Sequence, residues 1–198
     1  RPTGTGPALA RKTSADLGMM RLDTARLIIR PWQEKDRAPW AAIQADRVVR
    51  RFYYPPVLTR AESDAEIDRC LHHLDRHGFG FLALERRDDH ALIGGAGLSW
   101  TNDTPGAPAV ELGWILAQPF WRQGYAREAS LAWFAFGWAM GLEDIIGYTA
   151  ALNQPSRALM ESLGMRRNPA DDFADPTVPA DNPLSAHVLY RISRPLTA

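Results

Sequence analysis

Residues 110–128 read VELGWILAQPFWRQGYARE, and this stretch determines which fold the chain can adopt. Its first half alternates apolar and other residues from Val110 to Leu116, which is the period of a β-strand. Pro119 ends the strand, and a long apolar run with helical character opens after Trp121. A strand, a short turn and a helix form a phosphate-binding arrangement, because the first N–H groups of a helix have no internal partner and its dipole favours an anion.

The turn at residues 121–127, WRQGYAR, has the composition of an anion site. Gly124 and Ala126 are small enough for a diphosphate to approach the backbone, and two flanking arginines place positive charge at the rim. The chain contains no P-loop string GxxxxGK[ST], and residues 78–83 begin a GxGxxG fingerprint without its last glycine. The turn therefore belongs to another class of nucleotide loop.

The segment 121–129, WRQGYAREA, resembles the Q/R-x-x-G-x-G/A loop of the GCN5-related N-acetyltransferases (GNAT), which holds the pyrophosphate of acetyl-CoA. It is more closely similar to the W-G-x-G-Y-A-x-E-A variant of the branch that includes the ribosomal-protein N-terminal, or Rim-type, acetyltransferases. Trp121 departs from the general Q/R consensus. The resemblance implies that the loop binds acetyl-CoA through Arg122, Gln123, Gly124, Tyr125, Ala126 and Arg127.

The elements around this loop follow the GNAT order, so the resemblance covers residues 22–192. We expect an α+β fold of the α/β/α sandwich type, with a mixed, mostly antiparallel sheet of about seven strands and helices on both faces. By the resemblance, its central parallel pair is splayed. The predicted strands span residues 19–30, 79–86, 91–100, 110–117, 144–151, 165–167 and 184–192, and the predicted helices span 33–45, 60–76, 123–140 and 153–164. A polar, Pro-rich insertion at 168–182 precedes the last strand.

Length and composition indicate one domain in a reducing compartment. The chain has 198 residues, which suits a flexible extension at 1–18 followed by a single domain at 19–194. Zero formal net charge argues against strong attraction to nucleic acid or an anionic membrane. The single Cys70 excludes an intrachain disulfide, and the apolar stretch at 129–140 is too short to span a bilayer. We therefore expect a cytoplasmic monomer or homodimer.

Gly113 interrupts the strand of the opening segment. A glycine in mid-strand often marks a bulge or a close approach of another backbone. In the resembling family this strand bulges and splays from the next one, and the pantetheine arm of acetyl-CoA pairs with the freed backbone like an added strand. By that resemblance Trp114, Ile115 and Leu116 line the pantetheine. The alternative is an ordinary core strand.

Glu111 is the candidate general base. Transfer of an acyl group from a thioester needs a neutral amine, because an ammonium has no lone pair, and a carboxylate acting through water can take the proton. Glu111 alternates with the apolar residues of its strand, so it faces something polar, and a cleft there would raise its pKa. The alternative is a structural carboxylate that pairs with an arginine.

Asn153 and Ser156 begin a second similar segment, NQPSRALMESLGM, which resembles the family's N-x-x-S-x-x-x-x-x-x-x-G-F pattern. The resemblance implies that Asn153 binds the pantetheine amides and that Ser156 protonates the departing CoA thiolate. Some members use a tyrosine four residues later, but that position is Met160, which cannot donate a proton. Helix capping alone would also select Asn and Ser around Pro155.

Aromatic residues on loops and strand ends are the candidates for an acceptor pocket, with His187 as a polar residue in an apolar strand. His187 is alternatively a satisfied core histidine. His73 and His77 are four residues apart on a helix, but no third ligand lies nearby in sequence, so we expect a solvated helix end and no metal site. The pocket candidates are Trp32, Phe52, Tyr53, Tyr54, Trp100 and His187.

These observations predict an acetyl-CoA-dependent N-acetyltransferase. The acyl donor acetyl-CoA and an amine acceptor would meet in a ternary complex, and the amine would attack the thioester directly. The acceptor is either a protein or peptide N-terminus or a small-molecule amine. A different class, a non-catalytic module that binds or senses CoA, fits the same loop. The role of the insertion at 168–182 stays open.

Overall fold

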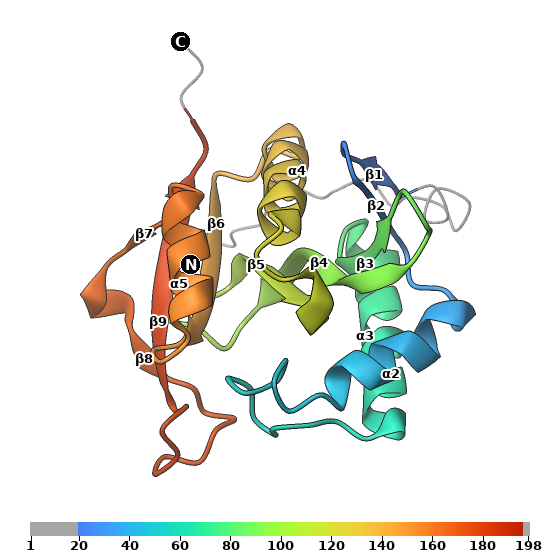
Figure 1. The fold of residues 1–198 in the computed structure, drawn as a ribbon. Helices are drawn as coiled ribbons and strands as arrows, with labels where there is room; N and C mark the ends of the chain where they lie inside the picture. Colours follow the sequence, from blue (N-terminus) through green and yellow to red (C-terminus); the bar gives the residue numbers. More distant parts are fainter. Residues whose placement is uncertain (1–19, 196–198) are drawn as a thin grey trace.

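The structure is a computed structural model that describes residues 20–195. The predicted extension at 1–18 lies outside the described residues. A mixed sheet of nine strands runs in the order β1-β2-β3-β4-β5-β6-β9-β7, and β8 pairs with β9 (Figure 1). The strands are β1 (Leu22–Asp23), β2 (Leu27–Arg30), β3 (Phe81–Arg86), β4 (Leu92–Thr101), β5 (Ala109–Leu116), β6 (Asp144–Ala150), β7 (Arg166–Arg167), β8 (Phe173–Ala174) and β9 (Ala186–Ser193).

Within residues 20–195 four α-helices pack around this sheet: α2 (Arg37–Gln44), α3 (Arg60–His77), α4 (Tyr125–Ala139) and α5 (Gln154–Ser162). The predicted capping box is present, because Thr59 accepts a hydrogen bond from the N–H of Glu62 and Glu62 bonds back to Thr59. The predicted fold class is confirmed: only β5 and β6 pair in parallel, whereas the other pairings along the described sheet are antiparallel.

Two elements differ from the expectation. The predicted strand at 19–30 divides into β1 and β2, because Thr24 closes a turn with Leu27. The Thr24 N–H donates to the Leu27 carbonyl, and the Thr24 hydroxyl accepts from the Leu27 N–H. The insertion contributes the short β8, which adds to β9. These two segments account for the difference between the expected seven strands and the nine observed.

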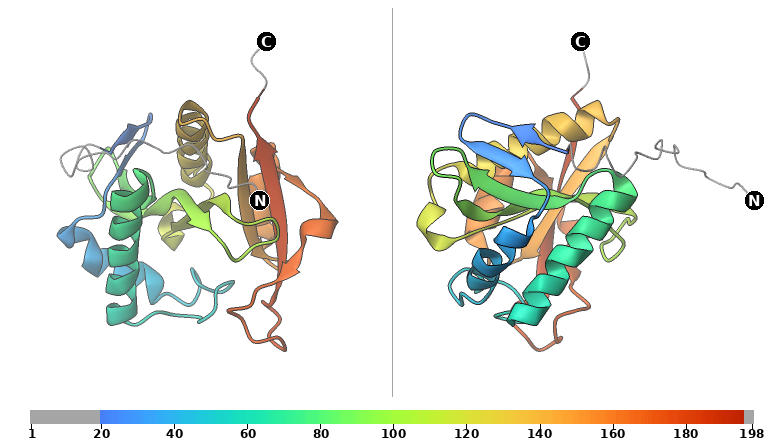
Figure 2. Two further views of the ribbon diagram at one scale, coloured as in Figure 1. Left: turned by 180° about the vertical axis from the view of Figure 1, so that it is seen from behind. Right: turned by 90° about the vertical axis from the view of Figure 1, so that its right-hand side faces the viewer.

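Helices cover both faces of the sheet (Figure 2). Successive residues of a strand point to opposite faces. Accordingly Leu82 and Leu84 of β3 join the larger core with α4 and α5, whereas Ala83 joins a smaller core with α2 and α3. Gly97 of β4 fits where a side chain would not, since an added Cβ would lie 2.0 Å from the carbonyl oxygen of Gly80.

A buried cluster of charges lies on β2 and β3. Arg30 pairs with Asp36 at 2.6 Å and with Glu85 at 2.7 Å. Glu85 also contacts His90 at 2.7 Å and Lys35 at 3.4 Å. Burial alone would raise the pKa of Glu85, but the hydrogen bonds and positive charges around it lower that pKa to about 2. The cluster therefore holds the Glu85 carboxylate ionised inside the fold.

Candidate active site

The central parallel strands β5 and β6 separate soon after they meet. Only Glu111 of β5 is in register with β6, opposite Ile146. β5 continues to Leu116 and β6 to Ala150 without further pairing, so a gap opens between their C-terminal halves (Figure 1). The predicted splay of the parallel pair is therefore present.

Gly113 does not mark a bulge against β4. The register between β4 and β5 is continuous from Thr101–Ala109 to Gly94–Leu116, with Gly113 opposite Gly97. The expected bulge was wrong on this side of the strand, and the sheet opens because β6 diverges from β5. The irregular pairing in this part of the sheet lies instead between β3 and β4, at Leu84 and Glu85.

Backbone groups of β5 face the gap at alternate residues. The carbonyl of Trp114 is 3.4 Å from the hydroxyl of Tyr53, and the carbonyl of Leu116 accepts a 2.8 Å bond from the Trp121 indole. The N–H and C=O groups of one residue in an antiparallel pair point to the same side. The N–H of Trp114 therefore also faces the gap and is open to a ligand.

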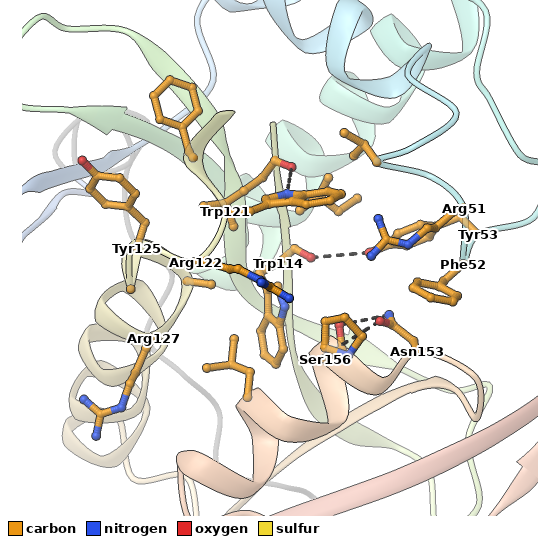
Figure 3. A pocket seen from close by; sticks show the side chains of 18 residues that line it. Arg51, Phe52, Tyr53, Trp114, Trp121, Arg122, Tyr125, Arg127, Asn153 and Ser156 are labelled. Atoms are coloured by element: carbon orange, nitrogen blue, oxygen red, sulfur yellow. Dashed lines mark hydrogen bonds between the residues drawn. The ribbon is translucent and has the colours of Figure 1, made fainter. Parts of the chain in front are cut away.

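A cavity of about 580 Å³ occupies this gap and its mouth. Its walls are the end of β5, the turn before α4, the start of α5 and the loop after α2 (Figure 3). The lining includes these residues predicted to bind acetyl-CoA: Trp114, Ile115, Leu116, Arg122, Gly124, Tyr125, Ala126, Arg127 and Asn153. Gln123 does not line it, because its amide donates to the Pro119 carbonyl at 2.7 Å and closes the turn.

The turn before α4 presents backbone N–H groups to this cavity. Gly124 is the N-cap in a left-handed conformation with φ 82°, and Arg122 has φ 58°. No side chain caps the helix start within the described residues. The N–H groups of Tyr125, Ala126 and Arg127 are the first of the helix, so they have no partner inside it. The geometry provides an anion site at the positive end of the helix dipole.

Arg26 and Glu128 hold the turn in place, and the sequence analysis did not identify either of them. The guanidinium of Arg26 pairs with Glu128 at 2.7 Å, donates to the Gln123 carbonyl at 2.8 Å and lies 4.4 Å from the centre of the Tyr125 ring. Glu128 also accepts bonds from Thr24 and from the N–H of Arg26. An acidic residue in the first turn of the helix was the available signal for Glu128.

Basic side chains surround the cavity mouth. Arg122 extends toward the middle of the cavity and Arg127 extends along the outer side of α4 (Figure 3). On the opposite side, the guanidinium of Arg51 lies 4.8 Å from the ring centres of both Phe52 and Trp121. Sequence reasoning did not single out Arg51, because its position depends on how the loop after α2 folds back over β5.

Asn153 is the N-cap of α5, Ser156 lies in the first turn, and both line the cavity. The Asn153 carbonyl oxygen accepts from the Ser156 N–H at 3.4 Å, and its amide donates to the hydroxyls of Thr149 at 2.9 Å and Ser156 at 3.0 Å. Because the Ser156 oxygen accepts from Asn153, its own O–H remains free to donate. The two alternatives, capping and ligand binding, are therefore compatible here. Met160 is buried beneath them.

A second cavity, of about 240 Å³, adjoins the first on the face of the sheet that carries Glu111. The two cavities share Phe52, Tyr53, Trp114 and Ser156, so they meet beside the middle of β5. The second is walled by β5, β6, the loop after α2 and the insertion before β9. Ligands in the two cavities would therefore be in contact near Trp114.

Glu111 is half-buried in the second cavity. Burial raises the pKa of Glu111, the hydrogen bond from the Tyr148 hydroxyl lowers it, and the charge of Asp175 raises it. The combined effect is a pKa of about 7. Among residues 20–195 no arginine pairs with Glu111. The alternative interpretation, a structural carboxylate paired with an arginine, predicted such a contact. A carboxylate with this pKa can accept a proton near neutral pH.

The structure divides the predicted acceptor residues into two groups. Tyr54 and His187 line the second cavity, together with Phe52 and Tyr53. Trp32 is buried between α2 and β3 and donates to the Phe81 carbonyl at 2.8 Å. Trp100 is near the C-terminal end of β4, where its backbone N–H donates to Nε2 of His73. Neither tryptophan reaches either cavity.

His73 is fixed rather than solvated at the end of α3. Its Nδ1 is 2.9 Å from the Phe79 carbonyl, and its Nε2 accepts from Trp100. His77 packs beside it with ring centres 4.4 Å apart. In the part of the chain that the structure describes, no group of three or more His, Cys, Asp or Glu side chains could hold a metal ion. No helix there is long and apolar enough to cross a membrane.

Comparison with known proteins identifies the family of the chain. Residues 26–166 match the family model described as the acetyltransferase (GNAT) domain. The uncharacterized N-acetyltransferase YnaD of Bacillus subtilis (strain 168) is 28% identical over 177 residues, which cover 87% of this chain and 96% of that protein.

Solved structures share the fold. A GNAT-family acetyltransferase from Bacillus anthracis has a TM-score of 0.73 at 24% identity, covering 88% of this chain and 98% of the other. Mycobacterium smegmatis RimJ, solved in complex with CoA-disulfide, has a TM-score of 0.67 at 18% identity, covering 84% and 81% of the two chains. The chain therefore belongs to the GNAT acetyltransferase family, whose members are N-acetyltransferases that use acetyl-CoA.

Proposed function

We propose that this protein transfers the acetyl group of acetyl-CoA to a primary amine by direct attack, with both substrates bound at once. The observation that carries the proposal is the pair of adjoining cavities that meet at Trp114, one with an anion-binding helix start and the other with Glu111. A ternary complex needs this arrangement, because the amine must reach the thioester without a covalent enzyme intermediate.

The first cavity fits the donor. The pyrophosphate would bind the free N–H groups at the start of α4, with Arg122 beside it. The pantetheine arm would lie in the gap between β5 and β6, where the backbone of Trp114 faces it. The complex of the RimJ neighbour with CoA-disulfide supports a CoA site in this fold.

The second cavity fits the amine. Glu111 would remove its proton, directly or through water, and its pKa of about 7 suits this step at neutral pH. The Trp114 N–H would stabilise negative charge on the carbonyl oxygen of the thioester during attack. The free O–H of Ser156 would donate to the departing thiolate.

Two measurements on the full chain test the proposal. Acetyl-CoA at millimolar concentration should raise the melting temperature, because a ligand that binds only the folded state stabilises it. A panel of amines and short peptides should release CoA, detected with a thiol reagent. Glu111→Gln should abolish most of this release, whereas Glu143→Gln, an exposed carboxylate at the start of β6, should not change it.

The same experiment separates the alternative of a non-catalytic CoA module. That alternative predicts thermal stabilisation by acetyl-CoA without CoA release on any amine. Absence of a thermal shift would contradict both possibilities.

A further inference from the structure

Asp175 and His187 form a pair of hydrogen-bond acceptors on one wall of the second cavity. Asp175 Oδ2 is 3.6 Å from His187 Nε2, which is too long for a hydrogen bond. The other oxygen, Oδ1, accepts from the N–H and the hydroxyl of Thr177 at 2.8 and 2.7 Å. Oδ2 accepts no hydrogen bond from residues 20–195, so it is free to bind another donor.

The second acceptor of the pair is the Nε2 atom of His187. Nδ1 is 3.2 Å from the carbonyl of Ser185, and a carbonyl only accepts, so Nδ1 carries the hydrogen. In the tautomer with hydrogen on Nδ1 the lone pair of the ring is at Nε2, the atom on the side of Asp175. The side chain is only 10% exposed, and its Nε2 has no hydrogen-bond partner within the described residues. An N–H donor placed beside both atoms would satisfy both.

The charge of the cavity favours a cationic ligand. Glu111 and Asp175 both line it, whereas no lysine or arginine is among its lining residues. Two carboxylates in a partly buried site repel each other, and a positive group between them relieves the repulsion. A ligand carboxylate would instead lose water without gaining a cationic partner. The cavity therefore discriminates against amines that carry a carboxylate.

The shape and the aromatic walls indicate a short alkyl chain. A cavity of about 240 Å³ is below the range of sites for drug-sized ligands, which begins at about 300 Å³. Phe52, Tyr53, Tyr54 and Tyr148 supply ring faces around it, and such faces attract an ammonium group and pack against methylene groups. An internal size limit and two separate acidic positions suit a small molecule better than a protein chain.

We infer that the acceptor is a small diaminoalkane-type amine, with two ammonium groups and no carboxylate, whose second ammonium binds Asp175 and His187. The reacting amine would then lie beside Glu111, close to Trp114 where the two cavities meet. This inference rests on the proposed transfer reaction and narrows its acceptor. Asp175 becomes a specificity-determining residue, and the insertion that carries it forms the wall of the acceptor site.

The test compares short diamines with a monoamine and an amino acid of four carbons, using the purified full chain and saturating acetyl-CoA. Diaminopropane, diaminobutane and diaminopentane are measured against butylamine and 4-aminobutyrate by CoA release. The best diamine should exceed butylamine in kcat/KM by about tenfold or more, the scale of one charge-assisted hydrogen bond. Aminobutyrate should be the poorest acceptor.

The variant Asp175→Asn provides the second part of the test. The asparagine oxygen can still accept from Thr177, so the turn is retained while the charge is removed. The ratio of kcat/KM for diaminobutane to that for butylamine should fall by about tenfold. Asp181→Asn, an exposed position on the same insertion, should leave the ratio unchanged.

Three results would overturn the inference while leaving the proposed function intact. These are equal loss on both amines in Asp175→Asn, efficient use of aminobutyrate, and a higher kcat/KM for N-terminal peptides than for any diamine. CoA release from no amine at all would contradict the inference and the proposed function together.

Discussion

Glu111 combines three properties that rarely coincide in one carboxylate. It lies at the single position of β5 that is in register with β6, it faces a cavity, and no arginine among residues 20–195 pairs with it. Its pKa of about 7 means that it is part protonated and part ionised at neutral pH. A group in this state can take a proton from an ammonium and pass it to water.

Replacing Glu111 by glutamine tests this role through the pH profile. We expect kcat to fall by about 10²- to 10⁴-fold, the usual contribution of a general base. In the parent protein kcat/KM should rise through about pH 7 as Glu111 ionises. This limb should vanish in the variant, whereas the limb set by the amine itself near pH 10 should remain. An unchanged profile would contradict the assignment.

The same substitution should also change stability, in a direction that depends on pH. The folded pKa of Glu111 is raised, so its neutral form is favoured and its contribution is lost as pH rises through about 7. The loss occurs between the unfolded pKa of 4.5 and the folded pKa of about 7. Glu111→Gln should therefore unfold at higher denaturant than the parent at pH 8, by on the order of 1–3 kcal/mol, and should match it closely at about pH 4, below the unfolded pKa. Urea unfolding at the two pH values measures this difference.

Single residues differed in how far the sequence could identify them. Glu111 was predictable because it is a lone charge in an apolar strand, and Asn153 because it starts a helix. Asp175 could not be identified from the sequence, because its place in the second cavity depends on the insertion folding back to β9 beside His187. Arg26 could not be identified either, because its partner Glu128 lies 102 positions away in the chain. Contacts of this kind have no local signal.

At the scale of elements, the pairing of β3 with β4 depends on Gly97, which lies opposite Phe81. An alanine there would bring its Cβ to 2.0 Å from the Gly80 carbonyl oxygen, and the backbone must move to avoid it. Gly97→Ala should lower the free energy of unfolding by about 1–3 kcal/mol or more. Gly113→Ala, on β5, would make only ordinary contacts from 3.7 Å and serves as the control. Equal loss in both variants, measured by urea unfolding, would refute this account.

Arg26 should matter for the affinity of the turn before α4 for acetyl-CoA more than for the stability of the fold. Arg26 is largely exposed, so its ion pair with Glu128 contributes little to folding. Arg26→Ala should raise the Kd for acetyl-CoA by about three- to tenfold, because the freed turn must be ordered on binding. Calorimetric titration measures this, with Arg60→Ala on the exposed side of α3 as the control.

Elements with a strong local signal were predicted well. Thr59 and Glu62 determined the start of α3, and Gly78 its end, because capping is decided within a few residues. The division of 19–30 into β1 and β2 was missed, since the turn at Thr24 is stabilised partly by Glu128 from α4. β8 was missed for the same reason: two residues form a strand only because β9 is already beside them.

For the whole molecule, the charge cluster on β2 and β3 sets the acid limit of stability. The pKa of Glu85 is lowered from 4.5 to about 2, so its contribution is complete above pH 4.5 and is lost as pH falls toward 2. Glu85→Gln should be less stable than the parent at pH 7, because Arg30 loses a buried partner. Its stability should also fall less steeply between pH 4.5 and 2, which denaturant unfolding across that range would show.

The described topology explains why the sequence alone does not locate the proposed acceptor site. Its walls come from the loop after α2, from β5 and β6, and from the insertion before β9, which are distant in sequence (Figure 1). The donor site, by contrast, is built mainly from the consecutive β5, turn and α4. This difference explains why one segment of sequence favours a donor site but carries little information about the acceptor.

The position of Trp121 predicts a change in tryptophan fluorescence when a ligand binds. Its indole is tied to the Leu116 carbonyl and lies under the guanidinium of Arg51, in the wall of the larger cavity. Tryptophan emission responds to the polarity and charge around the ring, and an entering diphosphate would alter both and draw Arg51 away. Intrinsic fluorescence should therefore report each binding and release of the nucleotide in real time, and Trp121→Phe should silence most of that signal.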